Sequence, residues 1–292
     1  IESEYLDRDL GYIHEAPAQL GMLSAVGKGA FRIRNPETAL ATFREAVRLA
    51  FTPPCGPVSI EIPIDIQAMM LPLPTDMQPV QAQPVVPAPS EVKALAQHLK
   101  LAKRPLLWLG GGARGAGPAV ERFVRMGWGV VTSVQGRGVL SEAHPANLGS
   151  YNLQPPTEAL YQTCDAMLVV GSRLRSNETL RYKLKLPHPL YRIDANPLAH
   201  NRGYKSDYFV HGDALSTLHA LADLLEGQMQ VDPALARDVR QTHAQAVALV
   251  DAALGPYAKL KQALSGQVGA ALWWVRDITC LLYTSPSPRD QR

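Results

Sequence analysis

Helical and strand periodicities alternate along this chain. Apolar positions recur at helical spacing after Asn35-Pro36-Glu37 and predict a helix over 38–50, and the proline-bounded apolar run 58–62 predicts a short buried strand. Beyond residue 90 we expect helices near 91–102, 118–126, 157–163 and 215–225, and strands at 105–109, 129–132, 166–170, 190–193 and 208–211. Repeated units of this kind form a parallel sheet with helices on both faces. The predicted fold class is α/β, a doubly wound parallel sheet preceded by part of a second α/β domain.

Prolines mark the domain boundary. Residues 71–90 contain six prolines, little charge and no periodicity, which is typical of an extended linker. An Ala- and Val-rich segment over 232–253 predicts a further helix. We therefore expect a first domain over 1–70, a linker over 71–90 and a central domain over 91–228, then a helical connection over 229–264 and the start of another domain at 265–279.

Both ends of the chain suggest a longer parent protein. The sequence begins at Ile1 without a methionine, in a polar stretch that has no signal-peptide character. After the strand-like run 271–275, residues 280–292 end in Ser-Pro-Ser-Pro-Arg-Asp-Gln-Arg and resemble a translated sequencing adapter. We expect 280–292 to be a non-native tail, with a natural disordered tail as the alternative.

Composition excludes several classes of protein. The 292 residues are 46% hydrophobic and 19% charged, which argues against disorder, and a net charge of +3 is too small for a nucleic-acid binder. No apolar run reaches the length of a membrane span. Three distant cysteines predict reduced thiols in a cytoplasmic compartment, without zinc or disulfides.

One glycine motif could approach a phosphate group. Residues 110–115, Gly-Gly-Gly-Ala-Arg-Gly, fit G-x-G-x-x-G between a predicted strand and a predicted helix. The acidic residue that an NAD site needs about twenty positions on is replaced by Thr132-Ser133-Val134-Gln135, which disfavours a dehydrogenase. A tight strand-to-helix turn without a ligand explains the glycines equally well.

Small, basic and acidic residues follow three more predicted strands. These are Gly171-Ser172-Arg173, Asp194-Ala195-Asn196 and His211-Gly212-Asp213, and together they indicate a nucleotide cleft, although helix N-capping would also explain Asp194 and Asp213. In the first domain, His14-Glu15 and Lys28 could face a site, but surface positions explain them better. The sequence contains no nucleophile elbow, P-loop or H-E-x-x-H motif.

Residues 56–67, Gly-Pro-Val-Ser-Ile-Glu-Ile-Pro-Ile-Asp-Ile-Gln, followed by the proline-rich linker and a six-strand α/β domain, resemble the thiamine diphosphate enzymes of the acetolactate synthase and benzoylformate decarboxylase group. The likeness continues, in the family's order, through 108–112, 169–173, 192–197 and 212–214, and covers about 2–279. It implies that 1–70 is the last part of a pyrimidine-binding domain and that 265–279 opens a pyrophosphate-binding domain.

The resemblance implies a fragment of a thiamine diphosphate- and Mg²⁺-dependent 2-keto acid decarboxylase or carboligase, most like the acetolactate synthase large subunit and a homodimer or homotetramer. The activating Glu is expected before Ile1 and the Mg²⁺ motif beyond Thr279, so we expect no catalytic or metal residue here and no activity from this chain alone. Ile13-His14-Glu15 matches the family's active-site loop Phe-Gln-Glu, and Lys28 matches a later Lys of that loop.

The synthase's central domain binds FAD, so the resemblance makes FAD possible here. The matching positions are Gly110, Gly111, Gly112, Gly149, Gly171, Arg173, Asp194 and Asp213. The chain departs from the synthase at Leu174-Arg175-Ser176-Asn177, where the family has acidic residues and a further Arg. The alternatives are a benzoylformate or oxalyl-CoA type decarboxylase, a non-catalytic FAD- or NAD-binding module, and a degenerate relative whose central domain is only structural.

Overall fold

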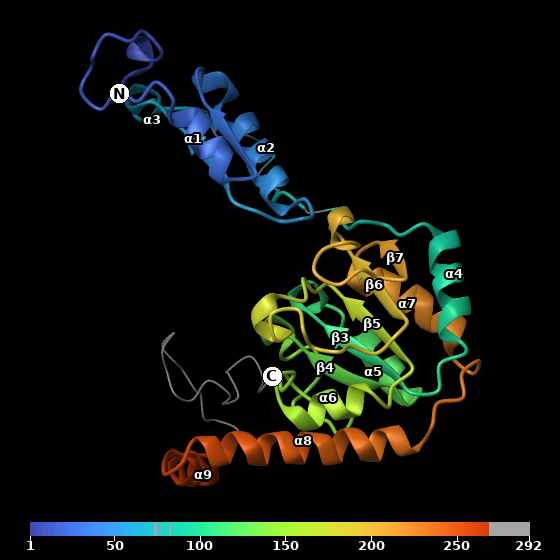
Figure 1. Cartoon of the computed structure of the whole chain (residues 1–292). Coiled ribbons are helices and arrows are strands. Elements are labelled where there is room, and N and C mark those ends of the chain that lie inside the picture. Colours follow the sequence, from blue (N-terminus) through green and yellow to red (C-terminus); the bar gives the residue numbers. More distant parts are fainter. Residues whose placement is uncertain (73–74, 77, 82, 269–292) are drawn as a thin grey trace. The chain divides into compact units, whose positions relative to one another are not determined.

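The structure is a computed structural model that describes residues 1–72, 75–76, 78–81 and 83–268 (Figure 1). The chain divides into two compact units between Pro84 and Val85. This division lies inside the predicted linker 71–90, of which no described residue before Pro89 belongs to a helix or strand.

The first unit is built around one β-α-β crossover. Strand β1 (Gly29–Arg32) and strand β2 (Val58–Glu61) pair in parallel, and helix α2 (Ala39–Phe51) connects them. The side chain of Asn35 accepts a hydrogen bond from the Glu37 amide at 2.8 Å and caps the short 3₁₀ turn η2 (Pro36–Thr38) that leads into α2. The predicted helix 38–50 and strand 58–62 are thereby confirmed, each to within one residue at either end.

The sequence analysis did not predict β1, and it also did not predict three other elements of the first unit. They are the 3₁₀ turn η1 (Ser3–Tyr5) and the helices α1 (Gln19–Val26) and α3 (Ile64–Gln67). The apolar residues of α1 do not gather on one side of the helix, so periodicity could not detect it, and none of its residues is buried.

The core of the first unit is smaller than the sequence suggested. Among its described positions only four apolar residues are buried: Ile33, Ala46, Pro63 and Ile66. Leu40 and Phe43 are among the apolar positions at helical spacing that predicted α2, yet they are 41% and 51% exposed, and β2 is half-buried rather than buried. A two-stranded sheet is too narrow to cover that stripe.

The second unit contains a five-stranded parallel sheet in the order β4-β3-β5-β6-β7. Its strands are β3 (Pro105–Leu109), β4 (Gly129–Thr132), β5 (Ala166–Val170), β6 (Leu190–Asp194) and β7 (Tyr208–His211), all close to the predicted ranges. The expected six strands are not found in the described part of the chain. A single bridge between Val130 and Asn147 stands where a strand beyond β4 would pair.

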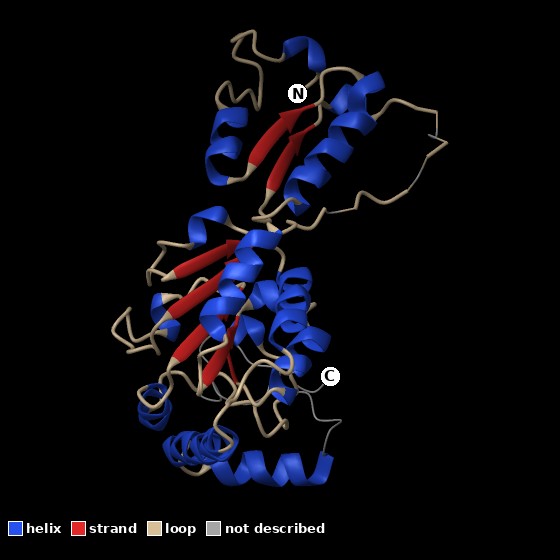
Figure 2. Ribbon diagram, turned by 90° about the vertical axis from the view of Figure 1, so that its right-hand side faces the viewer, coloured by secondary structure: helices blue, strands red, loops and turns tan. Residues whose placement is uncertain are grey.

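Helices cover both faces of this sheet, as Figure 2 shows, which confirms the doubly wound α/β class. One face packs on α4 (Pro89–Leu99), α5 (Gly117–Arg125) and α7 (Ala214–Leu225), and the other on α6 (Pro155–Tyr161) and α8 (Ala234–Ala253). Side chains of β3, β5 and β6 alternate between the two cores, as expected for strands covered on both sides.

Helix α8 belongs to the central domain, although the sequence suggested only a connection. Leu235 and Val239 are fully buried against the sheet. The Arg104 guanidinium donates hydrogen bonds to Asp232 at 2.6 Å and Asp238 at 2.8 Å, which fixes the start of the helix. Helix α9 (Tyr257–Val268) continues beyond residue 264, so 265–268 are helical, and the expected strand 271–275 and tail 280–292 lie outside the described residues.

A short 3₁₀ turn follows each of four strands at the carboxyl edge of the sheet. These turns are η3 (Gly111–Ala113), η4 (Val134–Gly136), η5 (Ser176–Glu178) and η6 (Pro197–Ala199). Cys55 and Cys164 are free thiols, and Cys280 lies outside the described residues. No helix in the described part of the chain is long and apolar enough to cross a membrane.

Candidate functional site

A cleft of about 260 Å³ opens at the carboxyl ends of β3 and β5. The next strand along the chain after β3 is β4, which pairs with one edge of β3. The strand after that, β5, pairs with the other edge of β3, so the direction of strand addition reverses at β3. Ligands of open parallel sheets bind in the crevice at such a switch point. The residues that line the cleft are Gly111, Gly112, Arg114, Ser133, Gln135, Gly171, Ser172, Arg173, Arg175 and Glu178.

The glycine turn after β3 packs directly on the turn after β5. The Gly110 amide donates to the Val170 carbonyl at 2.8 Å, and the Gly112 amide donates to the Gly171 carbonyl at 3.0 Å. A Cβ atom on Gly110 would lie 2.2 Å from the Gly171 carbonyl oxygen, and one on Gly112 would lie 2.9 Å from the Gly171 Cα. This close approach of two backbones accounts for Gly110 and Gly112 without a ligand.

The glycine motif also does not lead straight into a helix. The turn η3 intervenes, and α5 begins only at Gly117, which is outside the cleft. Because the Gly112 amide is already bonded within the protein, a phosphate group in this cleft would depend on side chains for most of its hydrogen bonds.

Three arginines give the cleft a positive charge. Arg114 donates to the side-chain oxygen of Gln135 at 2.8 Å, whereas Arg173 and Arg175 are exposed and make no side-chain hydrogen bond or ion pair with the described residues. One carboxylate opposes them: Glu178 is 8% exposed and accepts a hydrogen bond from the Val134 amide at 2.9 Å. Two free guanidinium groups at the mouth of a cleft suit an anionic ligand.

Four of the eight expected FAD-binding residues do not line this cleft: Gly110, Gly149, Asp194 and Asp213. The Asp213 carboxylate accepts from the Ser216 amide at 3.0 Å and caps α7, which is the N-cap that the sequence also predicted for this residue. Gly149 lies beyond the β4 edge in a left-handed conformation with φ of 76°, and its carbonyl accepts from the Thr132 amide.

The Asp194 side chain is largely buried and is hydrogen-bonded to a nearby backbone amide. Its carboxylate accepts from the Asn196 amide at 2.8 Å, while Asn196, not Asp194, caps the turn η6. Burial raises the pKa of Asp194 above its ordinary value, against the opposing effects of the hydrogen bond from the Asn196 amide and of the charges on Arg192 and Arg173. We therefore do not place Asp194 in the cleft, despite its position at a strand end.

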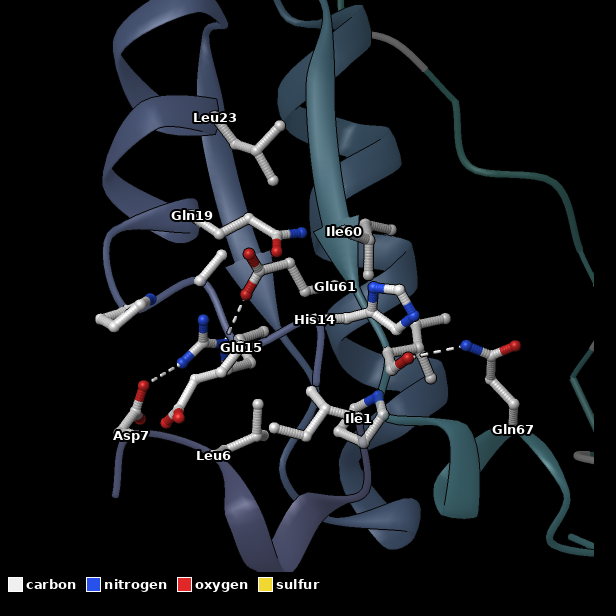
Figure 3. A pocket seen from close by; sticks show the side chains of 15 residues that line it. Ile1, Leu6, Asp7, His14, Glu15, Gln19, Leu23, Ile60, Glu61 and Gln67 are labelled. Atoms are coloured by element: carbon white, nitrogen blue, oxygen red, sulfur yellow. Dashed lines mark hydrogen bonds and ion pairs between the residues drawn. The ribbon is translucent and has the colours of Figure 1, made fainter. Parts of the chain in front are cut away.

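The first unit contains a second and larger pocket, of about 440 Å³, at the carboxyl ends of β1 and β2. His14 and Glu15 both line it, and Figure 3 shows their side chains pointing to different sides. Lys28 precedes β1 and therefore lies at the opposite end of the parallel strands, where its ammonium bonds to the Thr52 carbonyl. The structure therefore places His14 and Glu15 in one pocket, with their side chains on different sides of it, and separates Lys28 from both.

Charged residues that the sequence analysis missed stand in this pocket. Arg32 forms ion pairs with Glu61, across the two strands, and with Asp7 at 2.6 Å. Arg32 and Glu61 are partners in the β1–β2 register, which places their side chains side by side. If β1 had been recognised in the sequence, a signal would have been available: one strand ends in an Arg and the strand that pairs with it ends in a Glu.

The geometry defines a doubly wound α/β domain with a basic crevice at its switch point. Residues 92–221 of this domain match the family model described as the central domain of thiamine pyrophosphate enzymes. A solved structure from Mycobacterium smegmatis, described as that of a "putative thiamin diphosphate-dependent enzyme", aligns with a TM-score of 0.51 and 25% identity, over 66% of this chain and 38% of that chain.

Sequence relatives extend the match into the first unit. A Pseudomonas aeruginosa protein named "Probable 2-ketoarginine decarboxylase" is 30% identical over 290 residues, which are 97% of this chain and 51% of that protein. A Methanocaldococcus jannaschii protein named "Probable acetolactate synthase large subunit" is 29% identical over 69% of this chain and 36% of its own length. This chain belongs to the thiamine pyrophosphate-dependent enzyme family, and it spans about half or less of the length of these relatives.

Proposed function

We propose that this chain is part of a thiamine diphosphate- and Mg²⁺-dependent enzyme that decarboxylates a 2-keto acid and, in the carboligase case, transfers the remaining acyl group. The observation that carries the proposal is the alignment of 97% of the chain with the Pseudomonas decarboxylase. A 2-keto acid substrate and assembly as a homodimer or homotetramer, expected from the resemblance, belong to the same proposal.

The described residues do not themselves fit thiamine diphosphate and Mg²⁺. No group of three His, Cys, Asp or Glu side chains in the described ranges could hold a metal ion, and no Gly-Asp-Gly occurs in the 292 residues. We therefore assign no step of the reaction to a residue of this chain. In this family the cofactor supplies the carbanion chemistry, and the protein supplies position and electrostatics.

The test compares this chain with the whole product of its gene. The gene is sequenced upstream of codon 1 and beyond codon 279, and its product is assayed for CO₂ release from pyruvate, benzoylformate and 2-ketoarginine. We expect decarboxylation that requires thiamine diphosphate and Mg²⁺, and no turnover by the 292-residue chain assayed alongside. A gene product that releases no CO₂ from any of these acids, with cofactors present, would contradict the proposal.

We propose in addition that the central-domain cleft can hold the phosphate groups of FAD or a related nucleotide. Support comes from the backbone of Gly111 and the unpaired guanidinium groups of Arg173 and Arg175, which line the cleft together. A charge-assisted hydrogen bond to phosphate contributes about 1.5–3 kcal/mol, so one arginine has a measurable effect. Nucleotide binding in this cleft is also what we would expect if the chain were part of a non-catalytic FAD- or NAD-binding module.

Replacing Arg173 tests the nucleotide site. We expect the 292-residue chain to bind FAD or ADP, and Arg173→Ser to weaken binding about tenfold or more because a phosphate loses a charged donor. Arg240→Ser is the matched control, since Arg240 is an exposed residue of α8 that does not line the cleft. Isothermal titration calorimetry measures the nucleotide affinity of the wild type and of both variants. Equal affinities for wild type and Arg173→Ser would exclude this cleft as the binding site.

A further inference from the structure

The two connections that follow β5 and β6 are rich in exposed positive charge. Residues 171–189 lead from β5 to β6 and residues 195–207 lead from β6 to β7, and neither connection contains an α-helix. The only acidic residues between 172 and 206 are Glu178, which is buried, and Asp194, which is largely buried. Seven basic residues of the same stretch are exposed: Arg173, Arg175, Arg181, Lys183, Lys185, Arg202 and Lys205.

Contacts between the two connections bring some of these cations together. The Tyr204 hydroxyl donates to the Leu184 carbonyl at 2.9 Å, and the ring centroids of Tyr182 and Tyr204 lie 6.2 Å apart. A Cβ atom on Gly203, which has φ of 76°, would lie 2.9 Å from the Tyr182 ring. Residues 181–183 therefore lie beside residues 202–205. We define the basic face as four exposed cations and two exposed apolar residues next to them: Arg181, Lys183, Arg202 and Lys205, with Leu180 and Tyr182.

The basic face is held in place by the buried side chains beneath it. Leu184 and Leu186 of the first connection are buried in the core that the sheet shares with α6 and α8. Arg192 of β6 is fully buried, and its Nη1 bonds to the carbonyl of Ala199 and, at 3.4 Å, to that of Arg202. Because both connections are anchored in this way, a partner would lose little affinity to the ordering of this surface.

The four cations of the basic face lack anionic partners. Their side chains make no hydrogen bond or ion pair with the described residues, whereas Arg104 and Arg122 of the same domain each pair with two carboxylates. Two nearby carboxylates, those of Glu158 and Asp207, accept hydrogen bonds from backbone amides at 3.0 and 2.7 Å. Like charges that are held close together repel one another, so an anionic partner would stabilise this arrangement.

We propose that the basic face docks an acidic segment of another protein, one in which carboxylates alternate with apolar side chains. The carboxylates would accept paired hydrogen bonds from the guanidinium groups of Arg181 and Arg202. Leu180 and Tyr182 are 41% and 52% exposed, and they favour a polypeptide over a nucleic acid because apolar side chains can cover them and a phosphate backbone cannot. This inference goes beyond the proposed function and does not depend on it.

The test uses two peptides that differ only in charge. One consists of repeated Glu-Glu-Leu units, and the other has Gln in place of every Glu. Binding of each labelled peptide to the 292-residue chain is measured by fluorescence anisotropy at low and at physiological salt. We expect the acidic peptide to bind about tenfold more tightly, and its affinity to fall as salt screens the exposed charges. Equal binding of the two peptides, or binding of neither, would overturn the proposal.

Charge reversal then locates the contact. Arg181→Glu combined with Arg202→Glu is expected to weaken binding of the acidic peptide about tenfold or more. The matched control combines Lys93→Glu and Arg240→Glu, which change the net charge equally at exposed positions of α4 and α8 outside the basic face, and it should bind nearly as tightly as the wild type. Circular dichroism during denaturation shows whether each variant is folded, and Arg181→Gln combined with Arg202→Gln should give a smaller loss. Equal losses in the two charge-reversed variants would mean that the peptide responds to net charge and not to this face.

Two further measurements distinguish the kinds of partner. A single-stranded oligonucleotide of the same charge as the acidic peptide is expected to bind more weakly than the peptide. Tighter binding of the oligonucleotide would assign the face to nucleic acid and overturn the proposal. The whole gene product is expected to bind the acidic peptide as the 292-residue chain does. If only the 292-residue chain binds it, the rest of the enzyme covers this face, and no other protein docks there.

Discussion

Alanine at Gly110 is expected to prevent the central domain from folding. The added Cβ would lie 2.2 Å from the Gly171 carbonyl oxygen and 2.5 Å from the Ser172 Cα, and both are main-chain atoms that cannot rotate away. Relieving the overlap would separate the turns after β3 and β5 and break the Gly110–Val170 hydrogen bond. We expect a loss of about 4 kcal/mol or more in the free energy of unfolding, measured by denaturant titration.

The same motif provides its own control. A Cβ on Gly115 meets no atom within 4 Å, so Gly115→Ala is expected to change stability by less than about 1 kcal/mol. A phosphate-binding role shared by all the motif glycines would instead reduce nucleotide binding in Gly115→Ala without unfolding it. If Gly110→Ala folds with wild-type stability, the close packing of the two turns is not what requires a glycine there.

Alanine at Trp108 should have the second largest effect. The indole is fully buried in the core between the sheet, α6 and α8, and its Nε1 donates to the Ser172 hydroxyl at 3.1 Å. Truncation removes one of the two largest fully buried side chains of the described residues and leaves a cavity, so we expect a loss of about 3–5 kcal/mol in the free energy of unfolding. Circular dichroism during denaturation measures this without relying on tryptophan fluorescence.

Phenylalanine at Trp108 separates packing from the hydrogen bond. Trp108→Phe retains most of the ring volume but leaves Ser172 without its indole donor, so we expect a loss of about 1–2 kcal/mol. Because Ser172 lines the cleft, this variant should also weaken nucleotide binding. A Trp108→Ala variant that unfolds at the wild-type denaturant concentration would show that the surrounding core closes over the cavity.

Much of the second unit could be predicted from local sequence. Runs such as 105–109 and 166–170 are apolar throughout and flanked by turn residues, and the structure places strands at these positions. A strand buried on both faces needs an unbroken apolar run, which leaves a clear signal. The first unit gave a weaker signal because β1 has four half-buried residues and α1 has no buried face.

The candidate sites were predicted less completely than the fold. Gly171 and Arg173 meet the Gly111–Gly112 turn because β3 and β5 are neighbours in the sheet. Asp194 is the last residue of β6 and Asp213 follows β7, two strands that lie further along the sheet, and both carboxylates accept hydrogen bonds from nearby backbone amides. The order of strands in space is a property of the assembled sheet. The sequence alone therefore could not show that the residues after β3 and β5 line the cleft while those at the ends of β6 and β7 do not.

The sequence by itself determined the α/β class, the proline-rich boundary and the family resemblance, because these depend on local periodicity, composition and motif order. Only the tertiary structure decided which strand ends form the basic cleft, that Lys28 lies away from His14 and Glu15, and that Arg32 and Glu61 share a pocket. Residues distant in sequence meet through strand pairing and helix packing. Those contacts are set by the burial of whole faces, which no single segment of the sequence specifies.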